Sequence, residues 1–423
     1  MRDDNPVCHD GPLADMRARP SHGVGRDRRS TTEDGGTRAS ENVGAPETDF
    51  YTDHHNALFT RREWMADMLK NVLKSGLFGK APAPFGLDVG SSAVKVVQLA
   101  RDNGGFALEA LGIVPLPPDV ISEGAIKDPP TVVEAVREAI LKAGIKTRQA
   151  SIAICGRELI IKKVQIPEVP AKELHDAVQL EAEHHIPFAI EEVFVDYHVV
   201  GVHGGSMDLV LVAVKKSKVM EYLGVVEEAG LEPVIVDVDG FALSNQYEMN
   251  RPRNGAEAVA LIDIGASIMK TNVMKGGATL FARDIPFGGG HYTQAISQRL
   301  GISLDQAEAA KLARDPSVKW EALVPALEEV SRELSLEVQR TFDYFASTAE
   351  SEPIGKIVLA GGCAQLPGLS EYLSSTWGIP VELAKPFEHI NVDPMHAAEI
   401  GEAGPSLAVA VGLSLRRPGD KAA

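Results

Sequence analysis

The sequence predicts an α/β protein of two domains, and three observations carry this prediction. Residues 85–100 read FGLDVGSSAVKVVQLA, an apolar strand that reaches Asp88, turns on small residues and resumes as a strand. Residues 261–277 read LIDIGASIMKTNVMKGG and repeat that pattern, with Asp263 placed 175 positions (263 − 88) after Asp88. The second half then adds an apolar strand that ends in two glycines and leads into a helix. The repeated hairpin indicates internal duplication, and 423 residues suffice for two full cores.

Composition narrows the classes of function. The net charge of −17, from 42 basic and 59 acidic residues, argues against a general nucleic-acid binder. Cys8, Cys155 and Cys363 lie far apart and lack CxxC spacing, so we expect neither a disulfide nor a zinc site and infer a reducing cytoplasm. No uninterrupted apolar run reaches the roughly 18 residues of a membrane span. The first residues lack the apolar core of a secretory signal.

The first 80 residues divide into two segments. Residues 1–56 are rich in charged and small polar side chains without apolar periodicity, which predicts a disordered leader. Residues 57–80 place apolar side chains near helical spacing, which predicts an amphipathic helix. This helix could pack on the body, or it could touch a membrane surface or a partner. Translation could also begin at Met65 or Met68, which would make the leader an upstream extension.

Domain I is expected over residues 81–256. Its sheet is predicted from the strands of the first hairpin, at 85–89 and 93–100, and from those at 106–114 and 150–155. A helix is expected over 131–144 and ends at Gly144 as a C-cap would. A small α+β insert follows, with a helix over 172–185 that Pro187 stops and two strands in VFVDYHVVG and DLVLVAVKK. A helix over 217–229 and the strand EPVIVDVDG complete the domain, and the insert is bounded at about 156–235.

Domain II is expected over residues 257–423 and opens with the second hairpin. A helical subdomain is predicted at about 291–350, because this stretch lacks strand alternation. The strand KIVLAGG at 356–362 follows it. Helices are then expected over 368–377 and near 405–415.

The repeated hairpin has the chemistry of a phosphate site. Gly90 and Gly265 would let backbone N–H groups approach a ligand closely, and the serines beside them add hydroxyl donors. Asp88 and Asp263 would hold water on Mg²⁺ or orient an attacking water. The alternative is a pair of ordinary tight turns, in which Asp-x-Gly is common. The pairing of the two hairpins favours the phosphate site.

A third element supports a nucleotide in particular. Residues 357–369, IVLAGGCAQLPGL, form an apolar strand, a Gly-Gly pair and a helix start, which would let the backbone lie against a flat base or ribose. Residues 288–290 are three glycines that form either a phosphate-facing helix N-terminus or a flexible turn. One of Asp237 and Asp239 would face a metal, or their role would be N-capping of the next helix. The P-loop and GxGxxG patterns are missing.

These three elements, in this order, resemble the actin-like ATPase superfamily over residues 85–415, which implies an actin-like two-domain fold with ATP and Mg²⁺ between the domains. Residues 164–201, which contain an acidic helix, IPF and a DY strand, resemble the inserted α+β subdomain of the PilM family of type IV pilus assembly proteins. The related FtsA family shares that insert. Residues 300–315 resemble the AExxK helix of the same group.

The resemblance assigns site residues by position. The first phosphate hairpin would consist of Asp88, Gly90, Ser91, Ser92 and Lys95, and the second of Asp263, Gly265, Ala266 and Ser267. The ribose and base would be approached by Glu308 and Lys311 and lined by Gly361, Gly362 and Gln365, with Gly289 and Gly290 as further candidates. Mg²⁺ would be held by Asp88 and Asp263 through water. Ala266 departs from the first hairpin, where Ser91 supplies a hydroxyl.

The function implied by the resemblance is a cytoplasmic ATP-binding scaffold, peripheral at the inner membrane, with at most weak ATPase activity. Its insert would dock the cytoplasmic N-terminal tail of a PilN-like inner-membrane protein in a nucleotide-sensitive way, in a groove beside the core of domain I. Other pilus components and a second copy of the chain are further possible partners. The alternative function is a sugar- or acetate-type kinase of the same superfamily. The compact acidic insert offers no obvious small-molecule site, which favours the scaffold.

Overall fold

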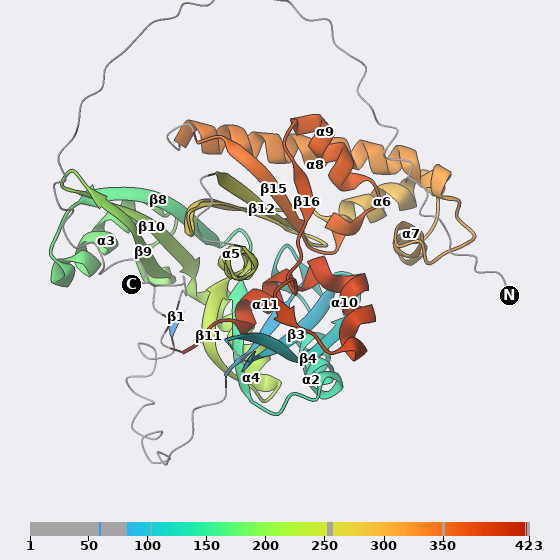
Figure 1. The fold of residues 1–423 in the computed structure, drawn as a ribbon, viewed down its shortest axis with the longest axis horizontal. Helices are drawn as coiled ribbons and strands as arrows, with labels where there is room; N and C mark the ends of the chain where they lie inside the picture. The colour runs from blue at the N-terminus through green and yellow to red at the C-terminus, as the bar shows by residue number, and fades with distance from the viewer. Residues whose placement is uncertain are drawn as a thin grey trace, which may run out of the picture.

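The computed structural model describes residues 59–60, 83–102, 104–251, 257–348, 352–418 and 420. Two sheets face each other across a crossing pair of helices, and a smaller third sheet extends to one side (Figure 1). Among the described residues, no helix is both long enough and apolar enough to cross a membrane.

The sheet of domain I grows from the first hairpin. Its main strands are β2 (Phe85–Val89), β3 (Ala93–Asp102), β4 (Gly105–Pro115), β7 (Gln149–Ile154) and β11 (Glu232–Val238). They lie in the order β11-β7-β2-β3-β4. The pairs β2–β3 and β3–β4 are antiparallel, while β2–β7 and β7–β11 are parallel.

The sheet of domain II repeats this plan. Its strands are β12 (Ala258–Ile264), β13 (Met269–Lys275), β14 (Ala278–Ile285), β15 (Ile354–Ala360) and β16 (Val381–Leu383). They lie in the order β14-β13-β12-β15-β16, again with two antiparallel pairs followed by two parallel pairs. Strand for strand, β12 corresponds to β2 and β15 to β7, so the duplicated hairpin belongs to a duplicated sheet.

Two short strands extend the edges of the first sheet. Strand β17 (Ile390–Asn391) lies beside β4, and β1 (Phe59–Thr60) pairs antiparallel with β11. At Phe59 and Thr60 the expected helix over 57–80 is therefore wrong, because an edge strand offers unpaired backbone groups that an extended segment can use. The rest of that expected helix and the expected leader over 1–56 lie outside the described residues.

The insert forms its own antiparallel sheet, in the order β8-β10-β9. Its strands are β8 (Leu159–Pro167), β9 (Val193–His203) and β10 (Ser206–Lys215), with the 3-10 helix η2 (Ile190–Glu192) leading into β9. Helix α3 (Ala171–His185) packs on this sheet through Leu174, Val178 and Ala182, which recur every four residues along one face. The small sheet thus spans residues 159–215.

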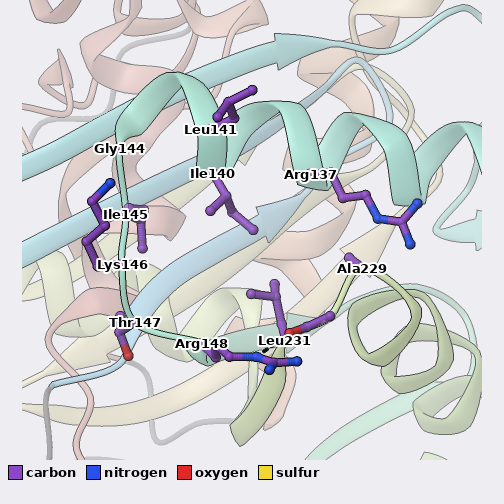
Figure 2. Close-up of a pocket in the computed structure, with 11 residues that line it drawn as sticks. Arg137, Ile140, Leu141, Gly144, Ile145, Lys146, Thr147, Arg148, Ala229 and Leu231 are labelled. Carbon is purple, nitrogen blue, oxygen red and sulfur yellow. Dashed lines mark hydrogen bonds between the residues drawn. The ribbon is translucent and has the colours of Figure 1, made fainter.

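Residues 216–235, which the expected bounds of 156–235 assign to the insert, lie with domain I. They form helix α4 (Lys216–Glu228) and the start of β11, and α4 contacts both α2 (Pro129–Ala143) and β11. The end of α2 is as expected, because Gly144 closes it in the left-handed conformation. A cavity of about 340 Å³ lies where the ends of α2 and α4 meet (Figure 2).

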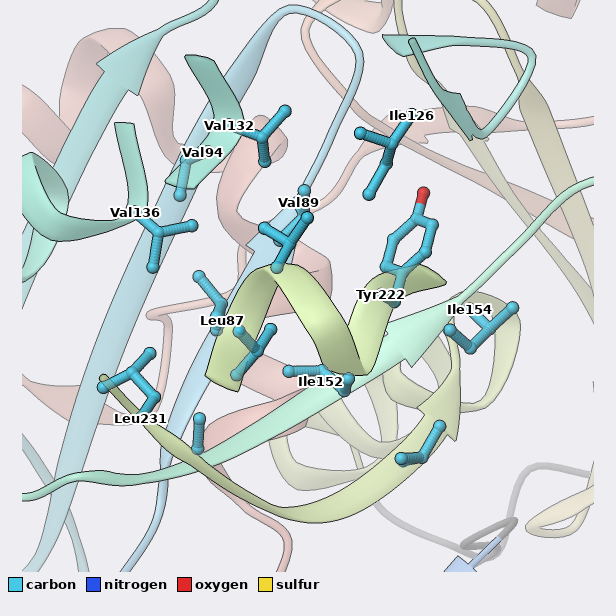
Figure 3. Close-up of a cluster of buried hydrophobic side chains, with 14 of the residues drawn as sticks. Leu87, Val89, Val94, Ile126, Val132, Val136, Ile152, Ile154, Tyr222 and Leu231 are labelled. Carbon is cyan, nitrogen blue, oxygen red and sulfur yellow. The ribbon is translucent and has the colours of Figure 1, made fainter. Parts of the chain in front are cut away.

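The core of domain I fills the space between its sheet and these helices. Side chains from β2, β3, β7 and α2 surround α4, which contributes Tyr222 (Figure 3). Burying each such aliphatic side chain stabilises the fold by about 1.5–3 kcal/mol. The Tyr222 hydroxyl donates to the carbonyl of Gly124, in the turn between β5 (Ile121–Ser122) and β6 (Ala125–Ile126). The core thereby fixes this short hairpin against the helix.

Domain II carries the expected helical subdomain between β14 and β15. It consists of α6 (Gly289–Leu300), α7 (Leu304–Lys311) and the long α8 (Trp320–Thr348). After β15 come the 3-10 helix η3 (Cys363–Gln365) and α9 (Leu369–Trp377). The expected helix near 405–415 is divided into η5 (Gly404–Leu407) and α11 (Ala408–Ser414), preceded by η4 (Pro394–His396) and α10 (Ala397–Ala403).

Helices α5 (Asp239–Asn250) and α11 cross between the two domains. Helix α5 follows the last main strand of domain I but contacts β12 and β13 of domain II, whereas α11 contacts β2, β3 and β7 of domain I. Where they cross, a side chain at Gly412 would overlap the carbonyl of Ala242. Each domain therefore lends a helix to the other, and the glycine permits the close crossing.

Candidate functional site

The two repeated hairpins turn in the same way. In the first, the Gly90 N–H donates to the carbonyl of Ala93 at 3.1 Å, and in the second the Gly265 N–H donates to the carbonyl of Ile268 at 3.1 Å. These four residues correspond pairwise in the repeat. The two predicted phosphate turns therefore share the same backbone hydrogen bond.

The tips of the two hairpins meet in the space between the domains. The Ser91 Oγ and Ser267 Oγ atoms lie 2.6 Å apart, a short hydrogen bond between residues of different domains. Ser92 is exposed beside them, and Ala266 occupies the position that corresponds to Ser91. A phosphate group placed between the tips would have to break the serine–serine bond.

Each hairpin carries an ion pair across its two strands. Asp88 on β2 lies opposite Lys95 on β3, with Oδ2 and Nζ 2.9 Å apart. Asp263 on β12 lies opposite Lys270 on β13, with the same two atoms 2.8 Å apart. Sequence analysis assigned Lys95 but missed Lys270, although both lysines follow their aspartate by seven positions.

A third carboxylate joins this cluster from helix α5. Asp239 is the first residue of that helix, and its Oδ2 lies 3.2 Å from Lys270 Nζ. Burial raises the pKa of Asp239, while Lys270 opposes that shift and the neighbouring carboxylates of Asp88 and Asp263 add to it. Burial alone would lower the pKa of Lys270, but Asp263 and Asp239 hold it well above its usual range. Lys270 is thus a firmly charged ammonium between two acids.

Asp237 has a different partner from Asp239. Its Oδ2 lies 3.1 Å from Nε of Arg416, and both side chains are enclosed. Burial raises the pKa of Asp237 to about 6, although the Arg416 guanidinium pulls it down. Of the two alternatives for these aspartates, helix capping is wrong, because the N-cap of α5 is Val238 and no side chain caps it. Asp239 joins the hairpins through Lys270, whereas Asp237 pairs with Arg416.

Asp284 links domain II to the start of the insert. Its Oδ2 accepts a hydrogen bond from the Gly156 N–H at 2.7 Å, and β14 also contacts β8. Burial raises the pKa of this carboxyl group to about 7, while the bond to Gly156 lowers it. This contact could not be predicted from the sequence, since nothing in the spacing of residues 156 and 284 relates them.

Of the two glycines that follow strand β15, Gly361 packs against the second hairpin and Gly362 does not. Gly361 has φ +89°, and a Cβ there would lie 2.5 Å from Asp263 Oδ1 and overlap the carbonyl of Ile264. Gly362, by contrast, has open space around the position of a Cβ. Gln365 lies two residues after Cys363, in η3. Burial raises the pKa of the Cys363 thiol to about 11, so it is held protonated.

The start of α6 is docked on the second hairpin. The Gly289 and Gly290 N–H groups donate to the carbonyls of Gly265 and Ala266, each at 2.8 Å. Of the two interpretations of residues 288–290, the freely phosphate-facing helix end does not describe these two N–H groups, because hairpin carbonyls already accept from them. A Cβ at Gly288 would lie 2.5 Å from the Gly265 carbonyl, so the contact requires glycine.

The predicted ribose and base residues come together on α7. Lys311 Nζ lies 2.7 Å from Glu308 Oε2 and donates to the Gly289 carbonyl at 3.1 Å and to Thr293 Oγ1 at 2.9 Å. Thr293 also donates to Glu308. A Cβ at Gly289 would be 3.3 Å from Lys311 Nζ and 3.5 Å from Cys363 Cβ. Helix α7, the start of α6 and η3 therefore meet around Gly289.

The carboxylates at the hairpins do not fit Mg²⁺ as expected. The Oδ2 atoms of Asp88, Asp239 and Asp263 all face lysine ammonium groups at 2.8–3.2 Å. In the described part of the chain, no set of three or more His, Cys, Asp or Glu side chains is arranged to hold a metal ion. A hydrated cation would have to compete with Lys95 for the Oδ2 atom of Asp88 and with Lys270 for those of Asp239 and Asp263.

The cavity at the ends of α2 and α4 is remote from this chemistry. It is lined by apolar and basic side chains, and two of the basic ones are already engaged (Figure 2). Arg137 donates to the Glu228 carbonyl at 2.6 Å, and Arg148 Nε donates to the Gly230 carbonyl at 2.7 Å. The candidate site is therefore the pair of hairpins together with α5, α6, α7 and η3.

Comparison with known proteins relates both domains to described families. The family model for the type IV pilus assembly protein PilM matches residues 86–418. The cell division protein FtsA of Bacillus subtilis (strain 168) is 23% identical, over 74% of this chain and 81% of that protein. FtsA of Escherichia coli (strain K12) is 23% identical, over 71% of this chain and 83% of that protein.

Solved structures give the same relationship. The structure of a PilM-PilN type IV pilus biogenesis complex superposes with a TM-score of 0.72 and 30% identity, over 79% of this chain and 98% of that chain. The ethanolamine utilization protein EutJ from Carboxydothermus hydrogenoformans superposes with a TM-score of 0.50 and 18% identity, over 81% of this chain and 93% of that chain, which is a likeness of fold.

Proposed function

The chain belongs to the family of the type IV pilus assembly protein PilM, and we propose that it acts as a nucleotide-binding scaffold of a type IV pilus machinery. The single observation that carries this proposal is the family match over residues 86–418, supported by the PilM-PilN structure with a TM-score of 0.72. These relatives also confirm the expected actin-like α/β fold and its link to FtsA. The family match sets aside the alternative of a small-molecule kinase.

ATP is the nucleotide we assign to the space between the two hairpins. The two equivalent turns, at residues 90–92 and 265–267, would receive its phosphates when the tips at Ser91 and Ser267 part. Lys95 and Lys270 would supply positive charge beside each turn. Glu308 and Lys311 would face the ribose and base, and the open space at Gly362 would let the backbone lie flat against them.

Ser92 provides a test of the phosphate turns. Replacing Ser92, which is exposed at the tip, with Asp puts a negative charge where phosphate should bind, and we expect ATP binding to be abolished. The matched control is Ser375→Asp, an equally polar change at an exposed position of α9. Calorimetric titration with ATP, with circular dichroism to check the fold, makes the measurement. Unchanged ATP affinity in the Ser92 variant would show that phosphate binds elsewhere.

The partner we assign is the cytoplasmic tail of a PilN-like inner-membrane protein. It would hold the scaffold at the cytoplasmic face of that membrane. The proposed docking region is where strand β10 of the insert runs into α4 of domain I. There Lys215 lies over the ring of Phe188, Lys216 lies over the ring of Phe194, and the side chain of Met220 is 45% exposed. An extended peptide could place apolar anchors against such a surface.

A physical route connects this region to the nucleotide. The hydrogen bond from Gly156 to Asp284 joins the first residues of the insert to β14, which pairs with the strand that carries Lys270. A displacement of the second hairpin would therefore be transmitted to the insert. If the tail changes the affinity for ATP, thermodynamic linkage requires ATP to change the affinity for the tail by the same factor.

The exposed methionines allow a direct test of the docking region. Met220→Asp should weaken binding of a synthetic PilN-like tail by about tenfold or more, because a charge replaces an apolar anchor. Met395→Asp, at a methionine that is 77% exposed in η4, should leave tail affinity unchanged. Titrations of the tail with and without ATP would show the linkage. Equal tail affinity in both variants would contradict the assigned region, and equal affinity with and without ATP would remove the nucleotide as a switch.

A further inference from the structure

Lys270 holds an unusual position in the nucleotide cleft. It lies on β13 directly opposite Asp263, and its side chain is only 12% exposed. Its Nζ is 2.8 Å from Asp263 Oδ2 and 3.2 Å from Asp239 Oδ2, so one ammonium bridges two carboxylates that come from different elements. An ammonium has three N–H donors, which leaves one for a further acceptor.

The Lys270 ammonium lies beside the turn proposed to bind the phosphates of a nucleotide. A Cβ built on Gly265 would lie 3.6 Å from Lys270 Nζ, and a Cβ built on Gly90 would lie 3.6 Å from Lys95 Nζ. Each ammonium therefore sits beside the glycine of a phosphate turn, at the same distance in both repeats. Lysine binds phosphate as a point charge, so these two positions suit phosphate oxygens.

Without Lys270, the same place would suit a divalent cation. Asp239 and Asp263 would then be two nearly buried carboxylates sharing one site, and oxygen ligands of this kind are what Mg²⁺ binds. With Lys270 present, the Oδ2 atom of each acid is already paired with its ammonium. The protein's own cation occupies the electrostatic role, and a metal would have to displace a buried side chain to take it.

We propose that Lys270 is a built-in substitute for the divalent metal, so that this chain binds nucleoside triphosphate and diphosphate without Mg²⁺. The proposal rests on the nucleotide site assigned above and concerns the same carboxylates that sequence analysis gave to Mg²⁺. The ammonium offsets one of the two negative charges of Asp239 and Asp263, and its remaining N–H would donate to a phosphate oxygen, as an N–H of Lys95 would from the first hairpin.

The test compares nucleotide affinity with and without metal. The full chain is titrated with ATP and with ADP by calorimetry, once in Mg²⁺ and once in excess EDTA, and the two affinities should agree within about threefold. In Lys270→Met the two acids lose their cation, so affinity in EDTA should fall by about tenfold or more and Mg²⁺ should restore it. Lys275→Met is the matched control on the same strand, where the lysine pairs with Glu352 at 2.8 Å, and it should behave as the parent chain.

A second readout does not depend on nucleotide. Mn²⁺ alone, followed by electron paramagnetic resonance, should find no site in the cleft of the parent chain and one site in Lys270→Met that Asp263→Asn removes. Lys270→Arg keeps the charge and should keep metal independence, which serves if the methionine variant is unstable.

The possible failures are distinguishable. Nucleotide binding by the parent chain only in Mg²⁺, or a Mn²⁺ site in its cleft that Asp263→Asn removes, would overturn this inference and leave the nucleotide site standing. Failure to bind nucleotide in either condition would overturn the nucleotide site and, with it, this inference.

Discussion

Arg416 carries its guanidinium into the interior beside Asp237, and its side chain is only 1% exposed. Among the described residues, its Nη1 and Nη2 atoms have no hydrogen-bond partner. Arg416→Met would leave the Asp237 carboxylate buried without its counter-ion, which should cost about 3–5 kcal/mol of unfolding free energy. Urea unfolding measures this loss.

The double variant separates the pair from its parts. Asp237→Leu combined with Arg416→Met removes both charges, and most of the lost stability should return because a buried ion pair contributes little over well-packed apolar side chains. A double variant as unstable as the single one would mean that Arg416 acts through packing at the end of α11, and not through Asp237.

Some residues of the candidate site could be predicted from the sequence, and others could not. The Asp–Lys spacing of the first hairpin recurs in the second, so Lys270 could have been found by applying the repeat to Lys95. Asp239 and Asp237 could not be told apart, because which of them faces the cleft depends on where β11 ends and α5 begins. The contact of Asp284 could not be predicted from the sequence, since its partner is a backbone N–H in a different domain.

At the scale of elements, the junction of β15 and η3 is the most constrained part of the site. Gly361→Ala would put a methyl group against Asp263 and the carbonyl of Ile264 in a backbone conformation that disfavours side chains, and we expect a loss of about 2 kcal/mol or more. ATP affinity should fall with it, because the methyl group displaces the end of β12. Thermal unfolding and ATP titration make the measurements.

The neighbouring glycine is the control for that prediction. Gly362 has φ −65° and no atom within 4 Å of the position of a Cβ, so Gly362→Ala should change stability by less than about 0.5 kcal/mol. Equal effects at the two positions would show that the pair is simply flexible and that the contact with Asp263 does not matter.

Most strands and helices could be predicted because their patterns are local. Strand β2 spans 85–89 as expected, and α3 begins one residue before the expected 172. The outer bound of the insert could not be predicted, since α4 reads as the same helix whichever sheet it packs on. Phe59 and Thr60 were misassigned for a similar reason, because pairing with β11 is a tertiary event.

At the scale of the whole molecule, the contact between the hairpin tips joins the two domains. Ser91 Oγ and Ser267 Oγ are 2.6 Å apart, so cysteines at both positions should form a disulfide on oxidation. That bond would hold the tips together and exclude phosphate, and ATP binding should disappear. Reduction should restore it. The two single cysteine variants serve as controls, and ATP binding that survives in the oxidised double variant would place the phosphates outside the hairpins.

The matching strand orders of the two sheets have a consequence for symmetry. If a two-fold axis related the repeats, a contact between Ser91 and Ser267 would imply an equivalent contact between Ala266 and Ser92. Ala266 has no hydroxyl, so the axis is broken where it passes between the tips. It is broken again outside them, because the connection after β4 holds a small hairpin and α2, while the connection after β14 holds α6, α7 and α8. An ancestral symmetric pair would have offered a nucleotide two equivalent orientations, whereas the site proposed for this chain would receive the base on one side only.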